Sequence, residues 1–183
     1  MKELPIRNSH MELGEIYFYT STIVGWKRLL KPDPYKRIII NSLKNLVDRQ
    51  CIIIYGFVIM PNHIHLIWEM LKKNGKEMPD TSFIKFTAHE LKKDLSKNYP
   101  PILDMFKTET NDREYQFWQR DALAIRIFSK EMLIQKLDYI HFNPLHEKWN
   151  LADRPEKYAW SSAKFYENGI DAFGFITHYM DKL

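Results

Sequence analysis

The feature that most constrains the fold is the stretch "CIIIYGFVIMPNHIHLIWEM", residues 51–70. Two runs rich in β-branched and aromatic residues flank "MPN", a pattern that predicts an antiparallel hairpin turning around Met60 to Asn62. Successive side chains on a strand point to opposite faces, so His63 and His65 point the same way. Any sheet built on this hairpin therefore carries two neighbouring imidazoles on one face of an otherwise apolar strand.

Hydrophobic periodicity predicts the remaining elements. Pro34 marks a helix start, Ser129 is expected to cap a helix with Glu131 in its first turn, and Pro144 is expected to stop that helix. The expected elements, in chain order, are a strand over 14–26, a helix over 33–50, the hairpin, a helix over 81–98, an irregular connector over 98–114, one or two strands over 115–128, a helix over 130–143 and a short helix around 160–169.

This order of elements predicts an α+β sandwich close to the ferredoxin-like pattern, with helices packed on a mostly antiparallel sheet. No internal repeat and no Gly/Ser-rich linker divides the sequence. We therefore expect a single domain over 1–183, with a core over about 14–145 and a C-terminal extension over about 146–183.

Composition narrows the function only loosely. The formal net charge of +4 and pI of about 9.0 are compatible with a polyanionic partner without requiring one. Cys51 is the only cysteine, which excludes an intramolecular disulfide and a cysteine-based zinc site. The N-terminus lacks the apolar core of a signal peptide, and no apolar run reaches the length of a membrane span. A cytoplasmic protein with no membrane partner is the expectation.

The helix expected over 130–143 carries a second polar pair. At about 100° per residue, Tyr139 and Asn143 lie roughly 40° apart, one turn from each other on a polar face. Leu133, Leu137 and Ile140 lie on the flank, where they can pack on the sheet. Helix geometry alone favours a boundary tyrosine, with its ring on the core and its hydroxyl in water.

Neutral imidazoles are common metal ligands, and two on one strand face suit a divalent ion. Two protein ligands are too few for a tight structural site, but they leave positions open for a third ligand, water and substrate. The His-x-His pattern by itself is a weak signal, because two ordinary histidines are more common than a metal site.

Several motifs in order strengthen the case. The segments "YGFVIMPNHIHLI", "FWQRD", "LDYIHFNP" and "RPEKYAWSSA" resemble single-tyrosine transposases of the HUH superfamily, and most closely the REP-associated tyrosine transposases. The resemblance spans roughly 16–166. Departures fall after Pro144, in "LHEKWNLADRP", and at 23–26, where relatives often carry polar residues. Both departures concern which DNA is recognised and leave the chemical positions intact.

The resemblance implies a metal-dependent endonuclease and strand transferase that acts on single-stranded DNA, recognises DNA hairpins and serves transposition and DNA recombination. His63, His65 and Asn143 would hold Mg²⁺ or Mn²⁺, and Tyr139 would form a 5′-phosphotyrosine intermediate. A phenol ordinarily ionises only near pH 10, so a nearby cation would assist the attack. Two imidazoles would suit zinc as well, so the choice of magnesium or manganese rests on the resemblance.

DNA contacts are expected from basic side chains that could follow a phosphate backbone. These candidates are Lys85, Lys92, Lys93, Arg120, Arg126 and Lys136. Two rival functions stay open: a domesticated protein that binds hairpin DNA without mobilising it, and a metal-binding α+β protein unrelated to DNA. The sequence also leaves open whether the chain is a monomer or a homodimer.

Overall fold

Strands β2 (Ile52–Ile59) and β3 (His63–Met70) form the expected antiparallel hairpin, turning at residues 60–62. The computed structural model describes residues 10–110, 112–120 and 122–182. The hairpin contains a β-bulge between Ile54 and Gly56, so one extra residue on β2 changes which side chains face each side of the sheet.

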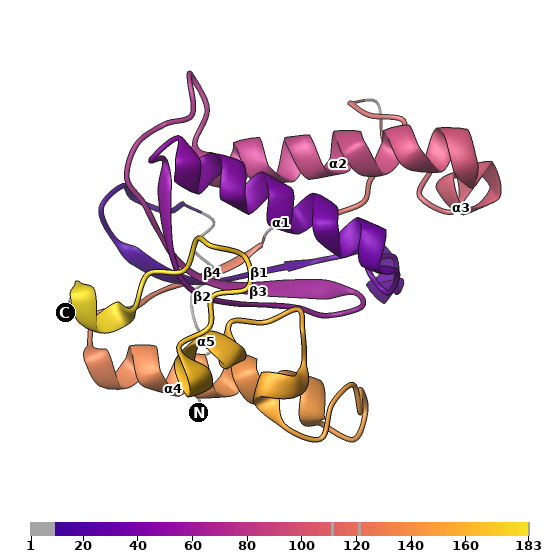
Figure 1. The fold of residues 1–183 in the computed structure, drawn as a ribbon. Helices are drawn as coiled ribbons and strands as arrows, with labels where there is room; N and C mark the ends of the chain where they lie inside the picture. The colour runs from indigo at the N-terminus through magenta and orange to yellow at the C-terminus, as the bar shows by residue number, and fades with distance from the viewer. Residues whose placement is uncertain (1–9, 111, 121, 183) are drawn as a thin grey trace, which may run out of the picture.

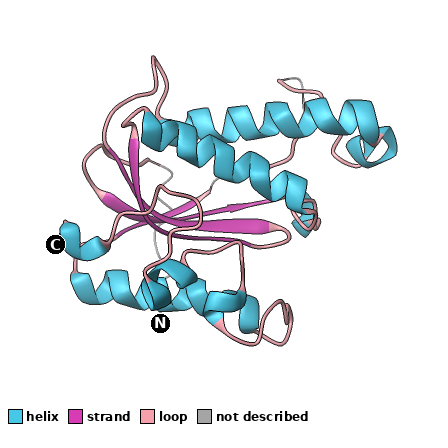
Figure 2. Ribbon diagram, viewed as in Figure 1, coloured by secondary structure: helices cyan, strands magenta, loops and turns pink. Residues whose placement is uncertain are grey.

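The sheet has four antiparallel strands in the order β2-β3-β1-β4, with β1 (Ile16–Thr22) and β3 in the centre and β4 (Leu123–Arg126) at one edge. Helices cover both faces of this sheet (Figures 1 and 2). The sandwich confirms the predicted α+β class and its strand, helix, hairpin, helix, strand, helix order.

Helices α1 (Asp33–Asp48) and α2 (Pro79–Asn98) lie side by side on one face (Figure 1). Alternate residues of β3 point into the apolar layer beneath them, namely Ile64, Leu66, Trp68 and Met70, all fully buried. Burying each such side chain stabilises the fold by about 1.5–3 kcal/mol. This face is therefore an apolar core.

The connector expected to be irregular over 98–114 contains a short helix, α3 (Pro100–Asp104). The expectation was therefore wrong over these five residues. Proline is tolerated in the first helical turn, where its missing N–H has no intrahelical partner, and both prolines occupy that turn.

Helix α4 (Lys130–Phe142) covers the opposite face of the sheet (Figure 1). The Ser129 side chain caps its start by accepting a hydrogen bond from the Met132 N–H at 3.2 Å, as predicted. The predicted flank of Leu133, Leu137 and Ile140 is buried against the sheet. Gly56 lies beneath this helix, and a Cβ there would stand 2.5 Å from Leu137 Cδ2.

The C-terminal segment runs along the outer edge of β2, the side of this strand that does not pair with β3. Ser161 forms an antiparallel bridge with Val58, and Ile176 forms a parallel bridge with Ile54. Covering an edge strand in this way protects its unpaired backbone groups. The segment includes α5 (Ala163–Asn168). Among the residues that the structure describes, the short 3₁₀ helices are η1 (Val24–Trp26), η2 (Asn143–Leu145), η3 (Pro155–Lys157) and η4 (Tyr179–Asp181).

The first strand is shorter than predicted, since β1 ends at Thr22 and η1 follows it. The buried thiol of Cys51 agrees with its apolar sequence context. Within the part of the chain that the structure describes, no helix is both long and apolar enough to cross a lipid bilayer.

Candidate active site

Polar side chains from two central strands meet on the α4 face of the sheet. In the β1–β3 register, Thr20 lies opposite His65 and Thr22 lies opposite His63. Directly opposed residues on adjacent strands share a face of the sheet. The two histidines therefore share one face of the sheet, as their spacing predicts, and the structure shows that this is the α4 face. Leu66, the residue after His65, points into the α1–α2 core.

His65 is held on three sides. Its Nδ1 lies 2.7 Å from Thr20 Oγ1, its Nε2 lies 3.2 Å from Asn143 Nδ2, and its ring stacks on Phe18 with centroids 5.2 Å apart. Because the amide nitrogen of Asn143 donates to Nε2, the proton of the neutral ring is on Nδ1 and is donated to Thr20 Oγ1. The imidazole is thereby fixed in both orientation and tautomer.

His63 is oriented by Asn62. The Asn62 Nδ2 donates to the Trp26 carbonyl at 3.1 Å, which leaves Asn62 Oδ1 to accept from His63 Nδ1 at 2.6 Å. The Trp26 carbonyl thus determines which way the amide faces, and the amide determines the imidazole tautomer. In this tautomer His63 Nε2 carries the lone pair of the ring, and the ring centroid of His65 is 4.7 Å away.

Both imidazoles are neutral at physiological pH. Burial lowers the pKa of His63 to about 4, with a further contribution from the charge of Lys148. Burial also holds the pKa of His65 well below its ordinary value, assisted by His63 and Lys136. The neutral ring is the form that coordinates a metal ion.

Tyr139 faces the two histidines from α4. Its side chain is 47% exposed, and its ring centroid lies 5.4 Å from that of His65 and 5.9 Å from that of Phe18. Lys136, one turn earlier on the helix, holds its Nζ 4.9 Å from the Phe18 ring centroid. A solvent-accessible phenol, a lysine and two neutral imidazoles therefore share one depression.

That depression is a cavity of about 840 Å³ between β1, β3 and the end of α4. Sequence reasoning did not predict several of its lining residues. A signal for Thr20 and Thr22 was present, since they repeat the i, i+2 spacing of the histidines on a neighbouring strand. The cavity is lined by Phe18, Thr20, Thr22, Trp26, His63, His65, Leu123, Ile125, Lys136, Tyr139, Asn143, His146, Glu147, Lys148 and Trp149.

The donor set fits a divalent cation. His63 and His65 are neutral, their Nδ1 atoms are occupied by neighbours, and Asn143 is 5% exposed with its amide against His65. Rotation of the Asn143 amide about its last torsion would present Oδ1, the donor that a hard cation prefers. Across residues 10–110, 112–120 and 122–182, no group of three or more His, Cys, Asp or Glu side chains is placed to hold a metal ion, so a site here would depend on the amide.

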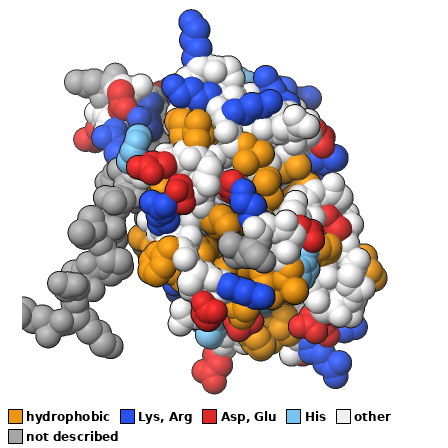
Figure 3. Space-filling model, turned by 90° about the vertical axis from the view of Figure 1, so that its left-hand side faces the viewer, with side chains coloured by type: hydrophobic (Ala, Val, Ile, Leu, Met, Phe, Trp, Pro, Cys, Tyr) orange, Lys and Arg blue, Asp and Glu red, His pale blue; other side chains and the backbone are white. Residues whose placement is uncertain are grey.

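The basic residues expected to contact DNA are dispersed. Lys136 lines the cavity, whereas the three lysines of α2 belong to the helix on the opposite face of the sheet. In the view of Figure 3, basic side chains are most frequent in the upper part of the face, and acidic ones lie among and below them. Each of the other candidates forms an ion pair: Lys85 with Glu77, Lys92 with Glu114, Lys93 with Glu90, Arg120 with Asp112 and Arg126 with Glu15. Their role in binding DNA stays a prediction.

Three aromatic or imidazole side chains from the segments that carry the resemblance lie away from the cavity. His141 is buried, with Nε2 2.8 Å from Ser162 Oγ. Trp118 is buried in the core and donates its Nε1–H to Thr87 Oγ1 at 3.0 Å. Trp160 is half-buried, with Lys36 Nζ 5.3 Å from its ring centroid. These contacts give all three side chains packing or hydrogen-bonding partners within the protein.

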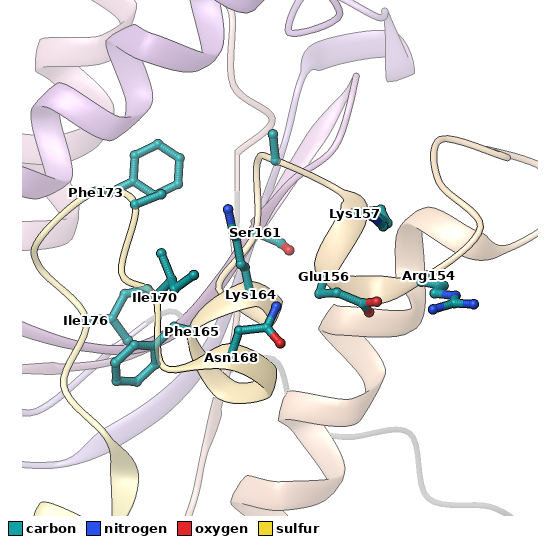
Figure 4. A pocket seen from close by; sticks show the side chains of 12 residues that line it. Arg154, Glu156, Lys157, Ser161, Lys164, Phe165, Asn168, Ile170, Phe173 and Ile176 are labelled. Atoms are coloured by element: carbon teal, nitrogen blue, oxygen red, sulfur yellow. The ribbon is translucent and has the colours of Figure 1, made fainter.

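A second cavity, of about 420 Å³, lies in the C-terminal segment and is lined by residues between Arg154 and Ile176 (Figure 4). Phe165, Ile170 and Phe173 contribute its apolar walls. This cavity is not lined by His63, His65 or Tyr139. The candidate site is therefore the cavity beneath α4, in which the predicted histidines, tyrosine and asparagine come together.

Comparison with known proteins supports the architecture. No protein-family model and no curated protein matches this chain. Its fold is similar to the solved structure of a REP-associated tyrosine transposase bound to a REP hairpin, with a TM-score of 0.60 and 16% sequence identity over 97% of this chain and 92% of that one. At this level of identity, the likeness establishes a shared fold, an α+β sandwich with helices packed on a four-stranded antiparallel sheet.

Proposed function

We propose that this protein is a metal-dependent endonuclease and strand transferase acting on single-stranded DNA, with Tyr139 as the nucleophile. The observation that carries the proposal is the convergence of an exposed phenol, two neutral imidazoles and a buried amide in one cavity. The fold-level likeness to a transposase bound to a DNA hairpin supports the same reaction class and a hairpin-forming substrate.

His63, His65 and Asn143 would hold Mg²⁺ or Mn²⁺. A divalent cation bound there supplies a Lewis acid that polarises a phosphoryl oxygen. The chain's own residues prepare the site for it: Thr20 and Asn62 orient the two rings, and burial keeps both imidazoles unprotonated. Lys136 and Lys148 line the same cavity and would attract the phosphodiester.

In the proposed step, Tyr139 Oη attacks the scissile phosphorus. The new bond joins the phenolic oxygen to phosphorus, and the bond between phosphorus and the 3′ oxygen breaks. The phenolic proton passes to water, and the leaving 3′ oxygen takes up a proton to become a hydroxyl. The products are a 5′-phosphotyrosyl protein and a free 3′ end. Attack by another 3′-hydroxyl reverses the step and transfers the strand without loss of bond energy.

Exposure suits Tyr139 to this role. The side chain is 47% exposed, so the phenol can reach a bound backbone, and the helix that carries it is anchored by three buried residues, Leu133, Leu137 and Ile140. Placing a nucleophile on a rigid element limits the entropy lost when substrate and phenol align.

Covalent trapping tests the proposal. Labelled single-stranded hairpin oligonucleotides, including those from the flanks of the gene, are incubated with protein and Mn²⁺ or Mg²⁺ and resolved on denaturing gels. Wild type is expected to form a protein–DNA adduct that both Tyr139→Phe and His63→Ala lose. Tyr99→Phe is the matched control, because Tyr99 is similarly exposed at the end of α2.

An adduct that persists in Tyr139→Phe would show that another residue is the nucleophile. Tight hairpin binding without any adduct would instead favour a domesticated protein that binds hairpins. Absence of DNA binding would favour the remaining interpretation, a metal-binding protein unrelated to DNA. DNA binding that weakens steeply as salt is added would count against that interpretation, because this salt dependence comes from contacts with phosphates.

A further inference from the structure

We propose that Trp26 is a stacking platform for an unpaired nucleobase next to the scissile phosphate. This inference rests on the proposed function of the same cavity and names a specificity-determining contact within it. Trp26 ends η1, lines the cavity together with His63, His65 and Tyr139, and exposes 60% of its surface. A large indole left in water at the mouth of a polar cavity offers a flat apolar face to a ligand.

The backbone at Trp26 is held in a conformation that a bulky residue rarely adopts. Its φ is +56°, after Gly25 at +65°. Hydrogen bonds impose this geometry: the Trp26 N–H donates to the Ile23 carbonyl at 3.0 Å, and the Ile23 N–H donates to the Asn62 carbonyl at 2.8 Å. Strain of this kind persists only where the surroundings over-determine it, and it clusters at ligand-binding sites. A glycine would adopt the same turn without strain.

Trp26 is also connected to the metal-binding candidates. Its carbonyl accepts from Asn62 Nδ2 at 3.1 Å, and Asn62 Oδ1 accepts from His63 Nδ1 at 2.6 Å. The Asn62 side chain therefore links the imidazole of His63 to the backbone of the residue that carries the indole. A base stacked on Trp26 would hold its own phosphate at a set distance from His63.

The surrounding charge favours a nucleotide over a neutral apolar ligand. Two lysines, Lys136 and Lys148, and one carboxylate, Glu147, line the cavity, which leaves an excess of positive charge. Single-strand-binding sites combine such cations, which meet the backbone, with aromatic rings, which stack on bases of any sequence.

Trp149, the other indole in the cavity, is engaged differently. It is half-buried, with the Arg28 guanidinium 5.5 Å and Lys148 Nζ 5.1 Å from its ring centroid and the His63 ring centroid 5.8 Å away. Two cations and the His63 ring therefore already contact the Trp149 ring. Trp26 has the greater free surface, which is why we assign the base to it.

The test measures binding of a labelled dT15 strand and of an abasic strand of the same length, in EDTA, so that no cleavage takes part. Trp26→Ala is expected to weaken dT15 binding about 10-fold, within the range found when stacked aromatics are removed, and to leave abasic binding unchanged. Trp26→Phe should retain most of the affinity. Phe128→Ala is the matched control, because Phe128 is 82% exposed beyond the far end of β1.

A further variant separates stacking from a structural role. Trp26→Gly should bind dT15 as weakly as Trp26→Ala while unfolding at equal or higher urea concentration than wild type, because glycine relieves the positive φ. Equal dT15 affinity in wild type and Trp26→Ala would overturn the inference, and so would equal losses for dT15 and abasic strands. Failure of wild type to bind either strand would overturn the inference alone, because the proposed function is tested with hairpin DNA, whereas stacking without a Tyr139 adduct would overturn only the proposed chemistry.

Discussion

The two faces of one sheet differ in what they do with the same strand. On β3, Ile64, Leu66, Trp68 and Met70 point into the apolar layer under α1 and α2. The alternate residues, which begin at His63 and include His65, point toward α4. Glu69 on the α4 face is also buried, and it accepts a hydrogen bond from Tyr55 Oη at 2.8 Å and pairs with Lys182 at 2.9 Å. The first face stabilises the fold; the second carries polar groups whose burial costs free energy unless each has a partner.

The apolar contacts on the α1–α2 face therefore offset the free energy that burying polar groups on the α4 face costs. Each buried imidazole and amide on the α4 face is matched to a neighbour, so the site is rigid but contributes little net stability. Neighbouring positions on β3 should consequently respond to substitution in opposite ways, one through stability and the next through activity.

The sharpest test of that contrast replaces Leu66, the residue directly after His65. Leu66→Ala should lower the free energy of unfolding by about 2–5 kcal/mol, because it leaves a cavity in the apolar layer. Urea denaturation measures the loss, and the adduct formed per folded molecule should stay near the wild-type value. His65→Ala should show the reverse pattern. Similar stability losses at both positions would contradict the division between the faces.

A smaller effect is expected where α4 approaches the sheet most closely. Gly56→Ala should lower the free energy of unfolding by about 1–3 kcal/mol, because the new methyl group meets Leu137 Cδ2 at 2.5 Å and Ile140 Cδ1 at 3.2 Å. A double-mutant cycle with Leu137→Ala, measured by urea denaturation, should show a loss smaller than the sum of the single losses. Strict additivity would mean that the side chains are not in steric conflict.

Acid should destabilise the fold through the buried histidines His63 and His141. Burial lowers the pKa of His63 and of His141 to about 4 in the folded chain, below the value near 6.5 for an unfolded one. The unfolded chain therefore binds more protons between about pH 4 and 6.5, and stability falls as pH drops through this window. From pH 7 to pH 5, His63 should account for a loss of roughly 1–2 kcal/mol.

Urea denaturation at pH 7 and pH 5 measures this loss, and His63→Gln should make stability less sensitive to pH. Leu66→Ala serves as the comparison on the other face, since it should lower stability equally at both values. A pH dependence unchanged in His63→Gln would show that the buried imidazole is not the group responsible.

The smallest stability effect is expected at Thr20, and it should be accompanied by a clear loss of metal affinity. Thr20→Val removes the partner of His65 Nδ1, which should cost about 1 kcal/mol in urea denaturation. It should also weaken Mn²⁺ binding about 10- to 100-fold by calorimetry, because the ring loses its orienting neighbour. Thr20→Ser keeps the hydroxyl and should bind nearly as wild type. Equal Mn²⁺ affinity in all three proteins would count against a metal site on this histidine.

Much of this arrangement was predictable from local patterns. The hairpin, the cap at Ser129 and the apolar flank of α4 each follow from spacing within a few residues, and all three are confirmed. The i, i+2 histidines and the i, i+4 pair of Tyr139 and Asn143 follow from the same periodicities. Their meeting in one cavity depends on the order of the strands and on the face that α4 covers; the resemblance implied that meeting, and the spacings alone did not.

What could not be predicted depends on contacts between distant segments. Asn62 orients His63 only because η1 returns to the hairpin turn and presents the Trp26 carbonyl. The positive φ of Trp26 has no local sequence signal beyond the preceding glycine. The lysines of α2 could be assigned to a helix from the sequence, but only the fold shows that this helix lies on the face opposite α4.

The most direct test of the central claim is to locate the covalent bond. After trapping with hairpin DNA and Mn²⁺, nuclease and protease digestion followed by mass spectrometry identifies which of the 10 tyrosines carries a nucleotide. The account predicts a single modified peptide containing Tyr139, with the phosphate on its phenolic oxygen. A nucleotide on any other tyrosine, or trapped DNA attached through a different residue type, would contradict it.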